Sequence, residues 1–159
     1  MELAKTQRWA GFLSMAVATT ALLALAVAAP AEDGKAAFER RQDTMKRMGH
    51  PFYLGIGRVV KGTAADGPDT VTAAQTVASL AGTLDWALFA RGSDVAESRI
   101  KPEIFAAKEH VDQLIAAVKT ATAQLLPAVK TSDKTAIAAA YAAVNDACNA
   151  CHKEFRKEE

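Results

Sequence analysis

Near the C-terminal end of this 159-residue chain, residues 148–152 read Cys-Asn-Ala-Cys-His. The pattern C-x-x-C-H is the attachment signature of c-type haem, in which two thiols form thioethers with one porphyrin. Positions three apart lie on the same face of a helix, so Cys148 and Cys151 can reach the same flat cofactor. His152 follows directly, and neutral imidazole is a common axial ligand of haem iron. The pentapeptide therefore predicts one covalent haem c, with His152 as a ligand of its iron.

Two other uses of paired cysteines fit the sequence less well. A redox disulfide of the C-x-x-C type belongs near a βαβ pattern, whereas these cysteines end an Ala-rich helical run. A structural zinc ion needs four nitrogen or sulfur ligands, and the chain has 2 cysteines and 3 histidines. Because His50 and His110 lie far from the pentapeptide in sequence, we expect neither to bind the iron.

The N-terminal end has the pattern of an export signal. Lys5 and Arg8 precede an apolar run over residues 9–29, which ends in small residues of the A-x-A type. This order is typical of a secretory signal peptide, and we expect residues 1–31 to be removed before Glu32. A retained membrane anchor is the alternative, because the run is nearly long enough to span a bilayer.

Export agrees with the haem motif, because bacteria attach haem to paired thiols outside the cytoplasm. We therefore expect residues 32–159 to form a periplasmic domain with no membrane attachment after cleavage. This segment keeps 17 of the 19 basic residues and 17 of the 18 acidic ones. Such a balance gives no support for binding to nucleic acid or to an anionic membrane surface.

Four stretches of this domain carry apolar residues at intervals of three and four, the spacing of amphipathic helices. The first follows the polar start at residues 32–34 and reaches residue 62. Pro51 is expected to kink or break it, because proline lacks an N–H donor. The second helix begins at Pro68, which suits a first turn, and its apolar face continues to Phe89.

The third helix is expected to begin at Pro102 and to end or kink at Pro127. Ser132 is the expected N-cap of the fourth helix, with Asp133 at its positive end, and this helix carries the pentapeptide. The sequence shows no convincing strand pattern. These features predict an all-α, antiparallel four-helix bundle of up-down-up-down topology with covalently bound haem.

Five short motifs lie one after another along the domain. They are residues 41–45 (Arg-Gln-Asp-Thr-Met), 57–62, 88–94, 101–105 (Lys-Pro-Glu-Ile-Phe) and 151–156. Their order and spacing resemble the cytochrome c′ family, which includes the low-spin cytochromes c-556; the family has Trp where Phe105 stands. The resemblance covers the whole of residues 32–159 and implies a haem-binding four-helix bundle.

By this resemblance, Arg41 and Gln42 would contact the propionates and edge of the haem. Ser93 and Asp94 would lie near the same haem from the loop after the second helix. Each residue also has an ordinary structural role as its alternative. Arg41 would then be a solvated surface charge, Gln42 a modest polar contact, and Ser93 and Asp94 turn-capping residues.

The resemblance also bears on both faces of the haem. Arg156 would stand beside the proximal face close to His152, with a solvated surface charge as its alternative. On the far side, the family places either a ligating Met or a bulky residue at the position of Met45. Residues 45–49 (Met-Lys-Arg-Met-Gly) look more like the c-556 branch. We therefore expect Met45 to be the sixth iron ligand, with Met48 as its rival and simple core filling as the other role.

The first hypothesis for function is a periplasmic mono-haem cytochrome that transfers electrons. The alternative is a five-coordinate haem protein that binds a small gas such as nitric oxide. A peroxidase-like enzyme is disfavoured, because the first helix offers no acid or base at the expected distal position. Homodimers are common in the family that the chain resembles, and the Ala- and Thr-rich second helix is compatible with one, but the same small residues would serve packing within one chain equally well. The redox partner is not identified by the sequence.

Overall fold

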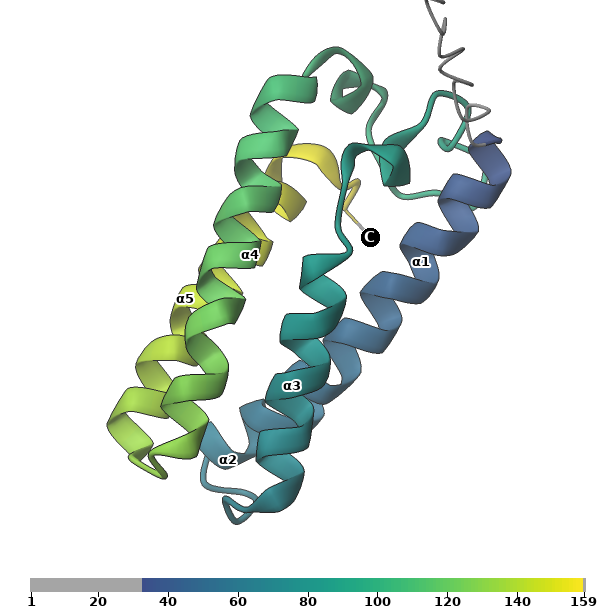
Figure 1. Ribbon diagram of the computed structural model, residues 1–159. Helices are drawn as coiled ribbons and strands as arrows, with labels where there is room; N and C mark the ends of the chain where they lie inside the picture. The colour runs from purple at the N-terminus through teal and green to yellow at the C-terminus, as the bar shows by residue number, and fades with distance from the viewer. Residues whose placement is uncertain (1–32, 159) are drawn as a thin grey trace, which may run out of the picture. The chain divides into compact units, whose positions relative to one another are not determined.

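The computed structural model describes residues 33–158, so the expected signal peptide, residues 1–31, lies outside the described residues. The main helices are α1 (Gly34–His50), α3 (Pro68–Gly82), α4 (Lys108–Lys130) and α5 (Lys134–Phe155). They run alternately in opposite directions (Figure 1). Within residues 33–158 the only β-type pairing is an isolated bridge between Ile100 and Arg156. The predicted antiparallel four-helix bundle is confirmed.

Pro51 changes the first helix without ending it. A π-helical segment, η1 (Pro51–Ile56), follows α1 and leads directly into α2 (Gly57–Val60). Met48, Phe52 and Ile56 are all buried and stand four residues apart. In an α-helix of 3.6 residues per turn, such a spacing drifts around the axis. The wider π turn offsets the drift, so these three side chains stay on one buried face.

The end of the bundle formed by η1 and α2 is closely packed. A Cβ atom at Gly55 would lie 3.0 Å from Cβ of Ala73 on α3, and one at Gly57 would lie 2.9 Å from Oη of Tyr141 on α5. Glycine therefore lets this segment approach both neighbouring helices.

The second helix is shorter than predicted. α3 ends at Gly82, and residues up to the predicted limit at Phe89 instead include a separate 3₁₀ turn, η2 (Trp86–Phe89). Glycine is a poor helix former, and the hydroxyl of Thr83 donates to the carbonyl oxygen of Leu80 at 2.7 Å, closing the helix end. Leu88 and Phe89 are buried although they lie outside the helix, which is why the apolar spacing ran past its end.

Three details of the last two helices also differ from the predictions. Pro102 opens a 3₁₀ turn, η3 (Pro102–Ala106), and α4 begins only at Lys108 and continues through Pro127. Asp133, and not Ser132, is the N-cap of α5. Its Oδ1 accepts hydrogen bonds from the N–H groups of Thr135 and Ala136, at 2.8 and 3.3 Å. Ser132 has a φ of 54° in the turn before the cap.

The helices do not contact one another evenly. α3 packs against α4 and η1, α4 packs against α5, and α1 packs against α3 and η2. α2 contacts α5 at one end of the bundle, whereas α1 and α5 stand apart toward the other end (Figure 1). In the part of the chain that the structure describes, no helix is long and apolar enough to cross a membrane.

Candidate haem site

A cavity of about 540 Å³ opens where α1 and α5 stand apart. Its wall includes Phe52, Val77, Leu114, Val118 and Val144, contributed by the first helix and by α3, α4 and α5. A volume of roughly 300–1,000 Å³ with a mainly apolar lining is usual for cofactor and small-molecule sites.

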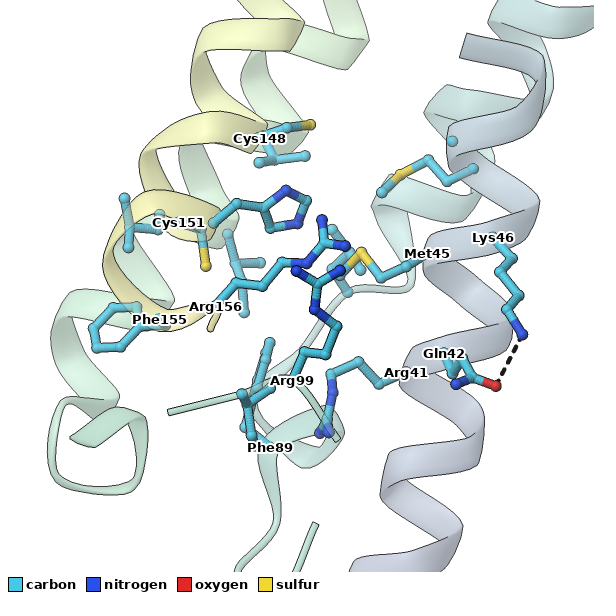
Figure 2. A pocket seen from close by; sticks show the side chains of 18 of the residues that line it. Arg41, Gln42, Met45, Lys46, Phe89, Arg99, Cys148, Cys151, Phe155 and Arg156 are labelled. Atoms are coloured by element: carbon cyan, nitrogen blue, oxygen red, sulfur yellow. Dashed lines mark hydrogen bonds between the residues drawn. The ribbon is translucent and has the colours of Figure 1, made fainter. Parts of the chain in front are cut away.

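The three residues of the predicted attachment motif line this cavity together. Cys148, Cys151 and His152 lie near the end of α5, and each is partly buried. Figure 2 shows Cys148 and Cys151 on neighbouring turns of that helix. The structure therefore brings together two thiols and one imidazole at an apolar wall, as attachment of haem c requires.

Burial changes the protonation of these groups before any haem is attached. It raises the pKa of the Cys148 thiol, and it raises the pKa of Cys151 to about 11, helped by the Glu154 carboxylate and by Cys148. Burial lowers the pKa of His152, and the positive charge of Arg156 lowers it further. His152 is thereby held neutral, which is the form that binds iron.

The donor set fits haem better than an ion held by protein groups alone. Among residues 33–158, no group of three His, Cys, Asp or Glu side chains is placed to hold a metal ion. His50 lines a different recess, beside Pro51, and His110 pairs through Nε2 with Oε2 of Glu154 at 2.8 Å. Neither of these histidines lines the cavity.

Met45 stands on the opposite wall, contributed by α1. Figure 2 shows its side chain extending into the cavity. Met48 also lines the cavity but is 7% exposed and belongs to the hydrophobic core, whereas Met45 is only partly buried. In α1, which is described throughout, the lining residues include no carboxylate and no imidazole.

Arg41 lines the same cavity, but its hydrogen bonds go to η2 and to the loop after it. Its side chain is 6% exposed. Nη1 donates to the carbonyl oxygen of Leu88 and to Oγ of Ser93, at 2.6 and 3.0 Å. Nη2 donates to the carbonyl oxygen of Ser93 and to Oγ of Ser98, at 2.8 and 3.0 Å. Burial lowers the pKa of Arg41, and the negative charge of Asp94 raises it.

The other residues suggested by the family resemblance occupy different positions. Gln42 lines the cavity, is exposed, and accepts a hydrogen bond from Nζ of Lys46 at 2.9 Å. Ser93 is fully buried against Arg41, and Asp94 is exposed; neither lines the cavity. Arg156 lines the cavity, and its charge acts on His152.

Sequence reasoning did not find the segment of residues 98–101, of which Ser98, Arg99 and Ile100 line one edge of the cavity. This segment pairs with the end of the chain. The N–H of Lys101 donates to the carbonyl oxygen of Phe155 at 2.8 Å, and the N–H of Lys157 donates to that of Arg99 at 2.7 Å. In Figure 2 the side chains of Arg99 and Arg156 extend toward one another and toward Met45. No local sequence pattern predicts a pairing between segments that lie so far apart in the chain.

Residues 36–156 match the family model described as cytochrome C′. The chain belongs to the cytochrome c′ family. It is therefore a c-type cytochrome with one covalently attached haem c. A cytochrome c′ from Rhodocyclus tenuis is 28% identical over 95 residues, which cover 57% of this chain and 71% of that protein.

Two solved structures of the family have the same fold. The cytochrome c′ of Thermochromatium tepidum is 29% identical, with a TM-score of 0.73 over 80% of this chain and 99% of that one. A carbon monoxide-bound variant of the cytochrome c′ of Alcaligenes xylosoxidans is 26% identical, with a TM-score of 0.70 over 79% of this chain and 98% of that one.

Proposed function

We propose that this cytochrome is a periplasmic electron carrier in which Cys148 and Cys151 hold the haem and His152 and Met45 bind its iron. Haem supplies one-electron chemistry through the ferric and ferrous states of its iron. The observation that carries the proposal is Met45, whose thioether enters the cavity from α1 while Cys148, Cys151 and His152 line it from α5. A His and Met ligand pair is typical of electron-transfer cytochromes.

The surrounding residues support this role in different ways. The apolar wall, which includes Phe52 and Val118, excludes water from the cofactor. We assign the haem propionates to Arg99, which lines the cavity and whose Nη2 also donates to the exposed carbonyl oxygen of Lys157 at 2.9 Å, because guanidinium and carboxylate groups pair well. Gln42 and Lys46 line the same cavity from α1 and are further candidates. Arg41 is a weaker candidate, because its hydrogen bonds are made to the loop.

The positive charge of Arg156 acts on His152. We therefore propose that Arg156 would stand close to His152, where its charge would disfavour protonation of the imidazole and so favour binding of the imidazole to iron.

A gas-binding function is the second candidate. The carbon monoxide-bound relative supports it, because that protein accepts a diatomic ligand on the same fold. In this candidate Met45 fills space without binding iron, and nitric oxide is a suitable ligand. We propose no enzymatic role, because α1 brings no carboxylate or imidazole to the cavity that could act as acid or base.

The optical spectrum of the purified ferric protein at neutral pH separates the two candidates. We expect a low-spin spectrum with a sulfur-to-iron charge-transfer band, because a thioether completes the coordination. A high-spin spectrum would contradict ligation by Met45 and would favour the gas-binding function.

We propose export because the family match begins at residue 36, after the expected signal peptide of residues 1–31. The mass of the protein recovered from the periplasm tests this, and we expect the chain to begin at Glu32 or within a few residues of it. Membrane-embedded protein with an intact Met1 would mean that the domain is tethered.

A further inference from the structure

One face of the first helix carries positive charge without acidic residues. Between residues 44 and 65 the sequence has four Lys and Arg residues and one His, and no Asp or Glu. We define the basic face as the exposed residues of this stretch as far as Lys61: Lys46, Arg47, His50, Tyr53, Leu54, Arg58 and Lys61. Asp43 offsets part of this charge at one edge, because its carboxylate lies 3.2 Å from Nη1 of Arg47.

The middle of the basic face is apolar. Tyr53 and Leu54 are 43% and 55% exposed, and they are the exposed large apolar side chains among residues 33–158. An apolar centre within a charged rim is the usual arrangement of a protein interface. The face thus has features of a docking surface and not only of a solvated helix.

The basic face is continuous with the haem site. Lys46 and Tyr53 belong to the face and also line the cavity, together with Gly49 between them. A macromolecule seated on this face would therefore lie beside the cofactor. Short distance to the cofactor is what electron exchange between two proteins needs.

We propose that the basic face is the docking surface for an acidic electron-exchange protein, an inference that rests on the proposed carrier function. Opposite charges would draw such a partner to the face and orient it. A second copy of this chain fits less well. A two-fold symmetric interface places the same patch on both subunits, so Arg58 and Lys61 would meet like charges.

The test compares two charge-reversed variants of the full haem protein. Arg58→Glu with Lys61→Glu reverses two charges on the basic face, and neither residue lines the cavity. Lys119→Glu with Lys134→Glu is the matched control. It makes the same change in net charge at exposed positions on α4 and α5.

Two flavin reductants distinguish docking from haem chemistry. Reduced flavodoxin is an acidic protein, whereas reduced lumiflavin is a small uncharged molecule with a similar reactive ring. In low salt we expect the reversed pair on the basic face to slow reduction by flavodoxin about tenfold, and the control pair to change it less than about twofold. High salt should remove this difference by screening, and lumiflavin should reduce all three proteins at the same rate.

The apolar centre has its own test. Leu54→Ser leaves the charge unchanged, so it should slow reduction by flavodoxin by a factor that salt does not remove. Equal slowing by both charge-reversed pairs, or an unmodified rate that does not fall with salt, would overturn the docking proposal.

Other outcomes separate this proposal from the function on which it rests. Reduction of the unmodified protein by lumiflavin but not by flavodoxin would refute the docking surface and leave the carrier function intact. Failure of both reductants, or a high-spin ferric haem, would refute the carrier function and the docking surface with it. A homodimer that sediments as a monomer after the basic-face reversal would assign the face to a second copy.

Discussion

The guanidinium of Arg41 donates hydrogen bonds to both the hydroxyl and the carbonyl oxygen of Ser93, at 3.0 and 2.8 Å. Ser93 is fully buried, so these bonds fix the loop after η2 against α1 from inside the molecule. The same guanidinium reaches Ser98, where the segment that pairs with the C-terminal end of the chain begins. Arg41 thus connects the first helix with the wall of the cavity on the side of α5.

Removal of Arg41 should therefore weaken the fold more than its helix position suggests. Arg41→Met leaves the buried carbonyl oxygens of Leu88 and Ser93 without their donor, and we expect a loss of about 3–5 kcal/mol in the free energy of unfolding. Arg41→Lys should lose less, because an ammonium group keeps the charge but not the planar fork. Unfolding of the haem protein by guanidinium chloride measures the loss of stability in both variants.

Arg40→Met is the control for this prediction. Arg40 forms an ion pair with Asp85, at 3.9 Å between exposed side chains, and such surface pairs contribute at most about 1 kcal/mol. If Arg41→Met costs no more than Arg40→Met, the buried bonds do not stabilise the loop.

The bundle, and the position of the C-x-x-C-H motif on its last helix, could be predicted from the sequence, because both depend on local periodicity. C-x-x-C-H needs only one helical turn, and residues 148–152 lie in α5 as expected. The prediction for Arg41 was incomplete because its hydrogen-bond acceptors lie about fifty positions further along the chain. The boundaries were wrong at Phe89 and Pro102 for another reason: 3₁₀ turns bury apolar side chains much as a longer helix would.

Gly57→Ala should destabilise the closed end of the bundle. The new Cβ would lie 2.9 Å from Oη of Tyr141, whose ring is stacked on Phe52 with centroids 4.4 Å apart. The tyrosine must move, and Phe52 lines the haem cavity. We expect a loss of about 1–3 kcal/mol, measured by urea denaturation.

Gly82→Ala provides the comparison for this substitution. A Cβ at Gly82, the last residue of α3, would meet nothing within 4 Å. Alanine there should stabilise the protein by about 0.5–1 kcal/mol, because it restricts the unfolded chain. Equal effects of the two substitutions would mean that the contact with Tyr141 relaxes without cost.

Protein produced without haem should lose the packing around its thiols. Haem in the proposed site would fill the space between Ala-rich helices, so its absence would remove much of the apolar contact in the core. In the folded arrangement the pKa of Cys151 is about 11, whereas an unperturbed thiol has a pKa of about 8.5. We expect alkylation of the haem-free protein to follow a pKa near that of free cysteine. The rate at pH 8 would then be on the order of a hundredfold above that of the buried thiol.

The pH profile of alkylation also shows how this prediction fails. Only the thiolate reacts, so a thiol that stays buried becomes reactive only as the pH approaches 11. A profile of that kind in haem-free protein, with a cooperative thermal transition at the midpoint of the haem form, would mean that the helices hold together without the cofactor.

Substitution of the two cavity methionines should separate iron ligation from core packing. Met45 is partly buried and enters the cavity, whereas Met48 is 7% exposed within the hydrophobic core. Met45→Ala should convert the ferric spectrum to high spin, let the ferrous iron bind carbon monoxide readily, and lower the reduction potential, because a thioether ligand raises it. Met48→Ala should keep the low-spin spectrum but cost about 2–5 kcal/mol of stability through the cavity that it leaves. If the two effects are exchanged, Met48 is the ligand and Met45 fills space. An unmodified protein that already binds carbon monoxide as fast as Met45→Ala would mean that neither sulfur binds the iron.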